Sequence, residues 1–245
     1  MCGRYASSRA PQDLAGLFDA QLAPDRPDRP VGPSWNVAPT DDVWAVLERA
    51  ARDTGEVQRR LRPVRWGLVP SWAKDPAVGS RMINARVETV HEKPAFRRAL
   101  AKRRCLLPAD GFYEWVAVPA TASAKAYKQP YFIRPEAGSV MAMAGLYEFW
   151  RDPAVADGDD PDAWLTTATI ITTEATDAAG RIHPRMPLAL DPGDYEAWLD
   201  PSHEDTAGLR ALLHTPGDGR LTVTAVSTAV NSVRNNGPHL LEPAA

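Results

Sequence analysis

The chain has only two cysteines, Cys2 and Cys105, among its 245 residues. Two thiols cannot form the disulfide framework of a small secreted domain, and without a Cys-x-x-Cys pair they do not predict a zinc site. The first ten residues, MCGRYASSRA, lack the apolar core of a signal peptide, and no later segment reaches the ~18 apolar residues that a membrane-spanning helix needs. We therefore expect a cytoplasmic protein with no metal, no cofactor and no membrane partner.

Net positive charge is also missing, since the formal charge at pH 7 is −3. The charge is unevenly distributed, however. Between Arg59 and Arg104 there are thirteen Lys or Arg residues and three acids, which leaves +10 in this segment and −13 in the rest of the chain. Charge runs often form solvated faces, but this segment also contains Trp66, Trp72 and Phe96. Cations interleaved with aromatic rings favour binding of single-stranded nucleic acid through phosphate neutralisation and base stacking.

Strand-like segments outnumber helical ones in this sequence. Strands are predicted at 42–48, 64–69, 104–107, 112–118, 130–134, 140–149, 165–173 and 221–227, and helices at 11–20, 94–103, 192–200 and 204–214. Loops are expected at 23–33, 119–129 and 151–162, the last two mobile. Because the strands are not separated by regular crossovers, we expect an α+β fold with a mostly antiparallel, partly closed, barrel-like sheet flanked by short helices. A single domain is expected over residues 1–236, with 237–245 as a C-terminal tail.

Cys2 becomes the first residue once Met1 is removed, and it then carries a free amine and a free thiol. Such a 1,2-aminothiol attacks an aldehyde through nitrogen and closes through sulfur to a thiazolidine. The amine titrates near ~8 and the thiol near ~8.5, so both are partly deprotonated at neutral pH. Arg4 is expected to place a cation beside the thiol and lower its pKa. The alternative is that Cys2 is a small residue after the start methionine with no chemical role.

Several motifs together resemble one known family. They are MCGRY at the start, WNVAPT at 35–40, WGLVPSW at 66–72, NAR at 84–86, RRCLLPADGFYEW at 103–115, AGLYEFW at 144–150, TT at 172–173 and IHPRMP at 182–187. Taken in this order, they resemble the SOS-response-associated peptidase (SRAP) family, members of which shield abasic sites in DNA. The resemblance runs from residue 2 to about 236. It implies the SRAP fold and a role in the DNA damage response.

The resemblance also implies a reaction. Cys2 is expected to form a thiazolidine with the ring-opened deoxyribose aldehyde of an abasic site in single-stranded DNA, giving a stable, slowly reversible cross-link. Asn84 is expected to hold the N-terminal cysteine and the sugar, and Arg86 to contact a backbone phosphate. Arg4, Arg97 and Arg98 are further expected DNA contacts. The protein would be associated with the nucleoid while bound to damaged DNA.

Two residues are candidates for proton transfer, because an abasic sugar is mostly a closed hemiacetal that has to be opened. Glu114, in GFYEW, would share a strand face with apolar neighbours, and desolvation there would raise its pKa into the range of general acid–base catalysis. His183, in IHPRMP, lies in a predicted loop stiffened by prolines and titrates near neutral pH. Each also has a structural interpretation, as a strand residue or a hydrogen-bonded histidine. The family often has an acidic or polar residue where this chain has Pro184.

The two tryptophans of WGLVPSW are expected to differ. One is expected in the core, and the other is a candidate for stacking on a base beside the lesion; both Trp66 and Trp72 are kept as DNA-binding candidates. Two other functions remain open from the sequence. Cys2 could be the N-terminal nucleophile of a thiol peptidase that acts on Met1, or the chain could be a non-catalytic module that binds single-stranded DNA.

Overall fold

The structure, a computed structural model, describes residues 2–23, 30–51, 54–121, 125–136, 138–157, 160–214 and 221–244. Five strands form a partly closed barrel, because the first and last of them also pair with each other in parallel over two residue pairs. In the order of pairing they are β5 (Val57–Trp66), β4 (Asp42–Ala50), β7 (Arg104–Ala109), β10 (Met141–Arg151) and β11 (Trp164–Glu174). Three short strands extend this sheet: β2 (Gln21–Leu22) on β5, and β6 (Asn84–Arg86) and β12 (Arg185–Pro187) on β11.

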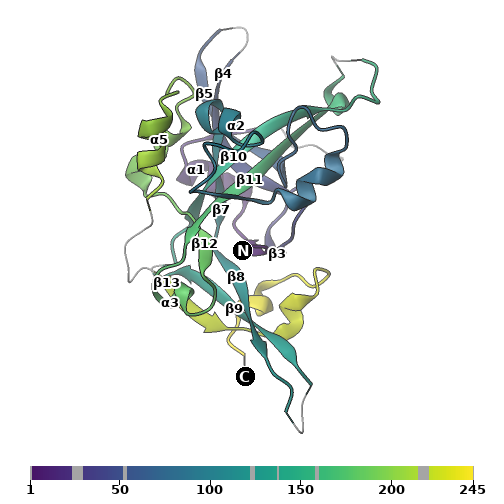
Figure 1. Cartoon of the computed structure of the whole chain (residues 1–245), viewed down its shortest axis with the longest axis vertical. Coiled ribbons are helices and arrows are strands. Elements are labelled where there is room, and N and C mark those ends of the chain that lie inside the picture. The colour runs from purple at the N-terminus through teal and green to yellow at the C-terminus, as the bar shows by residue number, and fades with distance from the viewer. Residues whose placement is uncertain are drawn as a thin grey trace.

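A second, antiparallel sheet lies beside the barrel. Its strands follow the order β13 (Leu221–Ala225), β9 (Tyr127–Pro135), β8 (Gly111–Val118), β1 (Tyr5–Ser7) and β3 (Ser34–Val37). Only Asp110 separates β7 from β8, so one length of chain passes from the barrel into the second sheet. Figure 1 shows the N-terminus between the barrel above and this sheet below.

Short helices and 3-10 turns pack around the barrel and the second sheet. The α-helices are α1 (Pro11–Leu17), α2 (Arg97–Lys102), α3 (Asp177–Gly180), α4 (Tyr195–Leu199) and α5 (Thr206–Leu212). The 3-10 turns are η1 (Pro76–Arg81), η2 (Pro161–Ala163), η3 (Pro192–Asp194), η4 (Thr228–Asn231) and η5 (Pro238–Leu241). No helix in the described ranges has the length and apolar character of a membrane span.

Both faces of the barrel strands are buried. Along β4, Ala45 and Leu47 point into the barrel with Trp66 and Cys105, whereas Trp44 and Val46 point outward to a cluster that includes Trp198 of α4. Burial on both faces explains why these strands are nearly continuous apolar runs in the sequence. Asn84, Glu114 and the chain around Cys2 meet where the barrel ends and the second sheet begins.

The α+β class and the partly closed sheet are confirmed, and most predicted strands and helices match within a few residues. The strand predicted at 64–69 is wrong in its bounds. β5 instead begins at Val57 and ends at Trp66, and it accommodates Arg59 and Arg65 opposite Glu48 and Asp42 of β4. The short strands β1, β3, β6 and β12 were not predicted, since three or four residues carry too little periodicity.

The predicted loops are partly corrected. Tyr127–Gln129 of the loop at 119–129 belongs to β9, and β12 occupies the end of the IHPRMP segment. Positions 24–29, 122–124 and 158–159 of the predicted loops lie outside the described residues. The segment predicted as a tail packs on the second sheet through η5, where Leu240 is fully buried. The described part of this segment thus contacts the second sheet as far as Ala244, whose N–H donates to the Ala225 carbonyl oxygen at 2.8 Å.

Candidate functional site

Cys2 lies fully buried at the junction between the two sheets. Its Sγ donates to the Arg4 carbonyl oxygen at 3.9 Å, and it belongs to the cluster that fills the barrel. β1 pairs with β8 at Tyr5 and Phe112, and continuing this register by two residues places Glu114 opposite Gly3, next to Cys2. Burial raises the pKa of the Cys2 thiol well above its ordinary value, and the Glu114 carboxylate raises it further.

Glu114 and His183 form a pair beside Cys2. Glu114 is 5% exposed on β8, and burial raises the pKa of its carboxyl, an effect that His183 opposes. His183 Nδ1 lies 3.9 Å from Glu114 Oε1, and its side chain is 29% exposed. Arg185 N–H donates to Nδ1 at 3.0 Å, and the same nitrogen lies 3.1 Å from the Arg185 carbonyl oxygen. A buried acid next to a half-exposed imidazole is suited to moving protons.

Asn84 reaches the same place from β6. Its Nδ2 donates to the Cys2 carbonyl oxygen at 2.7 Å, so the side chain orients the nucleophile's backbone directly. Its Oδ1 is buried and accepts no hydrogen bond within the described part of the chain. A buried amide oxygen without a donor is costly, and it therefore marks a position where an amine or hydroxyl of a bound group fits.

Three charged residues adjoin this centre. Arg86 is exposed two positions after Asn84, with buried Ala85 between them, so the two side chains lie on one face of β6 as predicted. Arg185, on β12, contacts both Glu88 oxygens, at 2.5 and 3.1 Å, and donates to the Thr172 carbonyl oxygen at 2.6 Å. Arg185 was not singled out from the sequence. Its spacing from His183, two residues along an extended segment, was the signal that could have found it.

The role predicted for Arg4 is corrected by its contacts. Its guanidinium Nη1 donates to Asn36 Oδ1 at 2.6 Å and to the Val230 carbonyl oxygen at 3.1 Å, and it lies 5.7 Å from the Trp115 ring. Arg4 therefore joins β1 to β3 and the C-terminal segment, and the pKa of the Cys2 thiol is raised instead of lowered. Asn36, in WNVAPT, is a second residue that the sequence did not single out.

One of the two tryptophans is buried and the other is exposed, as expected from the sequence. Trp66 is fully buried in the barrel, donates to the Ile83 carbonyl oxygen at 2.9 Å and packs edge-on against Tyr5. A buried ring cannot stack on a base, so the stacking prediction for Trp66 is corrected and remains for Trp72, which is 65% exposed. Arg97 and Arg98 are exposed on α2, a helix that packs against β7, β10 and α5.

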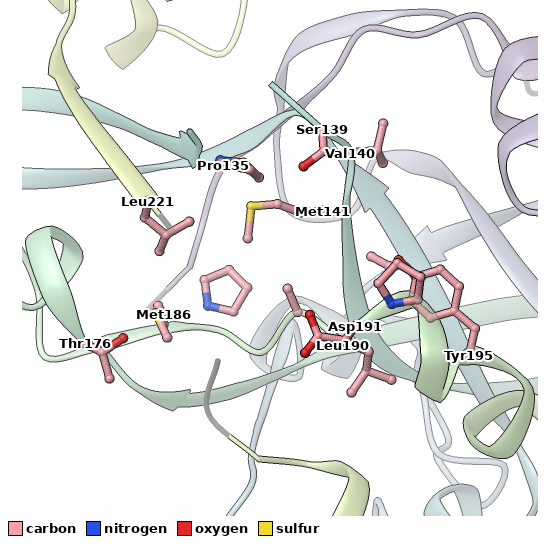
Figure 2. Close-up of a pocket in the computed structure, with 14 residues that line it drawn as sticks. Pro135, Ser139, Val140, Met141, Thr176, Met186, Leu190, Asp191, Tyr195 and Leu221 are labelled. Atoms are coloured by element: carbon pink, nitrogen blue, oxygen red, sulfur yellow. The ribbon is translucent and has the colours of Figure 1, made fainter. Parts of the chain in front are cut away.

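An apolar pocket of about 790 Å³, part of it open to solvent, lies behind β12. Figure 2 shows Met141, Met186 and Leu221 approaching this space from β10, β12 and β13. None of the predicted site residues lines it. Among the described residues, no group of three or more His, Cys, Asp or Glu side chains is placed to hold a metal ion.

Comparison with curated proteins identifies relatives that align with almost the whole chain. The chain is 37% identical over 243 residues to "Abasic site processing protein YoqW" of Bacillus subtilis, covering 99% of each protein. It is 33% identical over 283 residues to "Abasic site processing protein HMCES" of Pongo abelii, covering 99% of this chain and 76% of that one.

Solved structures share the fold. A protein from Bacteroides thetaiotaomicron aligns over 100% of both chains with a TM-score of 0.76 at 24% identity. One from Bordetella bronchiseptica aligns with a TM-score of 0.67 at 27% identity, covering 92% of this chain and 100% of that one. Residues 1–233 match the profile of the family described as SOS response associated peptidase (SRAP). With this match, these relatives and the motifs around Cys2, the chain belongs to the SRAP family.

Proposed function

We propose that this protein captures abasic sites in single-stranded DNA through a thiazolidine formed by the amine and thiol of Cys2 after Met1 is removed. The observation that carries the proposal is the convergence of Asn84, Glu114 and His183 on the one residue able to form a 1,2-aminothiol. The printed names of relatives that share the whole chain, abasic site processing proteins, support the same substrate.

The reaction needs no oxidant and no cofactor. The Cys2 nitrogen adds to the aldehyde carbon, and loss of one water leaves a C=N imine. Sulfur then bonds to that carbon, and the thiol proton ends on nitrogen. Because burial raises the pKa of the Cys2 thiol and keeps it protonated, we infer that nitrogen attacks first and that sulfur closes the ring second.

The neighbouring groups have separate tasks in this scheme. Glu114, whose pKa is raised by burial, donates a proton to the ring oxygen as the sugar opens, regains a proton from the nitrogen that has added to the aldehyde, and gives it to the hydroxyl that leaves as water. His183 accepts the proton of the sugar hydroxyl. Asn84 Oδ1, which lacks a donor, receives the Cys2 amine or a sugar hydroxyl.

DNA affinity comes from residues around this centre. Arg86 is exposed beside Asn84 and offers a guanidinium to a backbone phosphate, since Arg185 is already neutralised by Glu88. Trp72, the exposed tryptophan, offers a ring for an unpaired base next to the lesion. Stacking of this kind contributes ~1–3 kcal/mol per base and is independent of sequence.

The two buried cysteines provide a matched test. Wild type, Cys2→Ser and Cys105→Ser are incubated with a single-stranded oligonucleotide that carries one abasic site, and adducts are mapped by mass spectrometry after denaturation. We expect wild type and Cys105→Ser to give one adduct per chain on the N-terminal peptide, at the summed mass less one water. Cys2→Ser should give none. Equal adducts in Cys2→Ser would contradict the thiazolidine.

Reduction with borohydride distinguishes imine formation by the Cys2 nitrogen from ring closure by its sulfur. Cys2→Ser keeps an N-terminal amine, so it should still form an imine that borohydride reduces to a permanent adduct. Reversible DNA binding with no adduct in any variant, reduced or not, would indicate a non-catalytic binding module. Turnover of peptide bonds instead of one adduct per chain would indicate a peptidase, and cleavage of the oligonucleotide would indicate β-elimination from the imine.

A further inference from the structure

The turn that carries Trp72 is a short part of the connection from β5 to β6. It consists of residues 70–73, Pro-Ser-Trp-Ala, and the Ala73 N–H closes it by donating to the Pro70 carbonyl oxygen at 2.9 Å. Trp72 is its third residue and is 65% exposed. We name residues 70–73 the Trp72 turn. No strand of the described chain includes this turn, so sheet pairing does not hold it in place.

Strand β11 holds the chain just before the Trp72 turn. Val69 N–H donates to Thr167 Oγ1 at 2.9 Å, and both residues are fully buried. Gly67 N–H, two residues earlier, donates to the Ala168 carbonyl oxygen at 2.7 Å. A hydrogen bond between buried groups is costly to break, because water does not replace the lost partner. The chain therefore enters the turn from a fixed position on β11.

Trp150 of β10 holds the other end of the turn. Its indole Nε1 donates to the Ala73 carbonyl oxygen at 2.7 Å, across 77 positions of sequence, and the residue is only 4% exposed. An indole has one donor and no acceptor, so this bond satisfies the only polar group of the ring. The contact joins two of the motifs found in the sequence, WGLVPSW and AGLYEFW.

A second buried tryptophan provides a comparison. Trp198 Nε1 donates to the Cys105 carbonyl oxygen at 3.0 Å, but Cys105 lies in β7, a strand that is paired on both sides. Strand pairing therefore keeps Cys105 in position without the indole. Ala73 lies in no strand, so the position of its carbonyl group depends on Trp150 in a way that Cys105 does not depend on Trp198.

The Trp72 turn is attached close to the proposed reaction centre. Thr167, which holds Val69, lies three residues before Ile170, and Ile170 pairs with Asn84. Three residues of strand span about 10 Å. Since neighbouring phosphates of one stacked DNA strand are about 3.4 Å apart, this distance corresponds to about three nucleotides. A strand whose abasic site lies at Cys2 therefore has its next few bases within reach of Trp72.

We propose that Trp150 is a positioning residue for DNA binding, whose indole N–H fixes the Trp72 turn so that the Trp72 ring is ready to stack on a base. The inference rests on the proposed stacking role of Trp72. A ring that is held in its binding orientation beforehand loses less conformational entropy when DNA binds, so more of the stacking energy appears as affinity. Trp150 is buried and acts only through the turn.

The test measures the affinity of the full chain for a fluorescent single-stranded oligonucleotide without an abasic site, by anisotropy at fixed ionic strength. Trp150→Phe removes the N–H and keeps an aromatic ring, and Trp198→Phe is the matched control because it removes the same donor elsewhere. We expect affinity to fall about tenfold in Trp72→Ala and about threefold or more in Trp150→Phe, and to change by less than about 1.5-fold in Trp198→Phe. Melting curves check that each variant is folded. If Trp150→Phe does not fold, benzothienylalanine, which has sulfur in place of the indole N–H, is placed at position 150.

A double-mutant cycle separates positioning from a general effect on stability. When Trp72→Ala is already present, adding Trp150→Phe should change affinity by less than about 1.5-fold, because no ring is left to position. Hydrogen exchange of the peptide that covers residues 69–76 gives a second readout. We expect it to be faster in Trp150→Phe and unchanged in Trp198→Phe.

Three results would overturn the proposal. Wild-type affinity in Trp150→Phe, or an equal loss with and without the Trp72 ring, would overturn it and leave the stacking role of Trp72 in place. Wild-type affinity in Trp72→Ala would overturn both. The oligonucleotide contains no aldehyde, so failure of the Cys2 chemistry leaves this test unaffected.

Discussion

Two glutamates, Glu114 and Glu148, are buried, and their surroundings differ. Glu148, 7% exposed, contacts Arg103 at 2.7 Å and accepts a hydrogen bond from its neighbour's backbone at 2.9 Å. Glu114, 5% exposed, lies beside Cys2 and His183, and burial raises its pKa. A buried carboxylate held by an arginine stabilises the fold, whereas one with a raised pKa next to a nucleophile is suited to proton transfer.

Glu114→Gln should slow cross-linking to abasic DNA roughly hundredfold while raising stability at neutral pH. The folded protein binds this proton more tightly than the unfolded chain. Stability therefore falls as pH rises from about 4.3, the ordinary glutamate value, through the raised pKa, and stays lower above it. The substitution removes that pH-dependent fall, which thermal melts across this range would detect.

Glu148→Gln is the matched control for this prediction. It leaves Arg103 without its carboxylate, so it should lower the free energy of unfolding by about 1–3 kcal/mol and leave the rate of cross-linking nearly unchanged. If Glu114→Gln destabilised the protein as Glu148→Gln does, Glu114 would be a structural partner and not the proton donor.

At the scale of elements, the connection from β5 to β6 carries both Trp72 and Asn84. The chain leaves β5 at Gly67, which has φ of +126°, and crosses Gly79 of η1 so closely that a Cβ on Gly67 would lie 2.6 Å from the Gly79 carbonyl oxygen. Gly67 N–H donates to Ala168 at 2.7 Å, which attaches the crossing to β11. This crossing lets Trp72 stay exposed while Asn84 returns to the barrel.

Gly67→Ala should destabilise the protein by about 2–4 kcal/mol, because the new Cβ meets backbone and the φ is unfavourable for any other residue. Chemical denaturation measures the loss, and cross-linking should slow because Asn84 is displaced. Gly16→Ala, within α1 and with open space around its Cβ, should instead stabilise by about 0.5–1 kcal/mol. Equal effects of the two substitutions would show that the crossing is not constrained.

At the scale of the whole molecule, the C-terminal segment holds the second sheet in place beside the site. Asn36 Nδ2 donates to the carbonyl oxygens of Val230, Ser232 and Asn235 at 2.9–3.3 Å, and its Oδ1 accepts from Arg4. The strand that follows Cys2 is thus connected to the last part of the chain. Leu240 completes a small core with Tyr113 and Phe132 on the same sheet.

Leu240→Ala should therefore lower the free energy of unfolding by about 2–4 kcal/mol, as expected for a fully buried leucine. The exposed neighbour His239→Ala should change it by less than about 0.5 kcal/mol. Thermal or chemical denaturation measures both. A negligible effect of Leu240→Ala would mean that residues 237–244 behave as the tail expected from the sequence.

The fold class and the family were predictable from the sequence alone, and so was the aminothiol that removal of Met1 would create at Cys2. Strands buried on both faces appear as apolar runs whatever their partners, and an aminothiol depends only on residue type and chain position. The same holds for the candidates Asn84, Glu114 and His183, which lie in recognisable motifs. Short strands such as β6 and β12 could not be predicted from the sequence, because their pairing with β11 is a long-range contact.

The surroundings of each candidate residue depend on the tertiary structure. It buried Trp66 and exposed Trp72, turned Arg4 away from the thiol, and raised the pKa of Cys2. It also divided the basic segment, pairing Arg59 and Arg65 with acids on β4 and placing Arg60 and Arg62 on the other face of β5. Exposure, desolvation and ion pairing depend on residues distant in the chain, so no local pattern in the sequence specifies them.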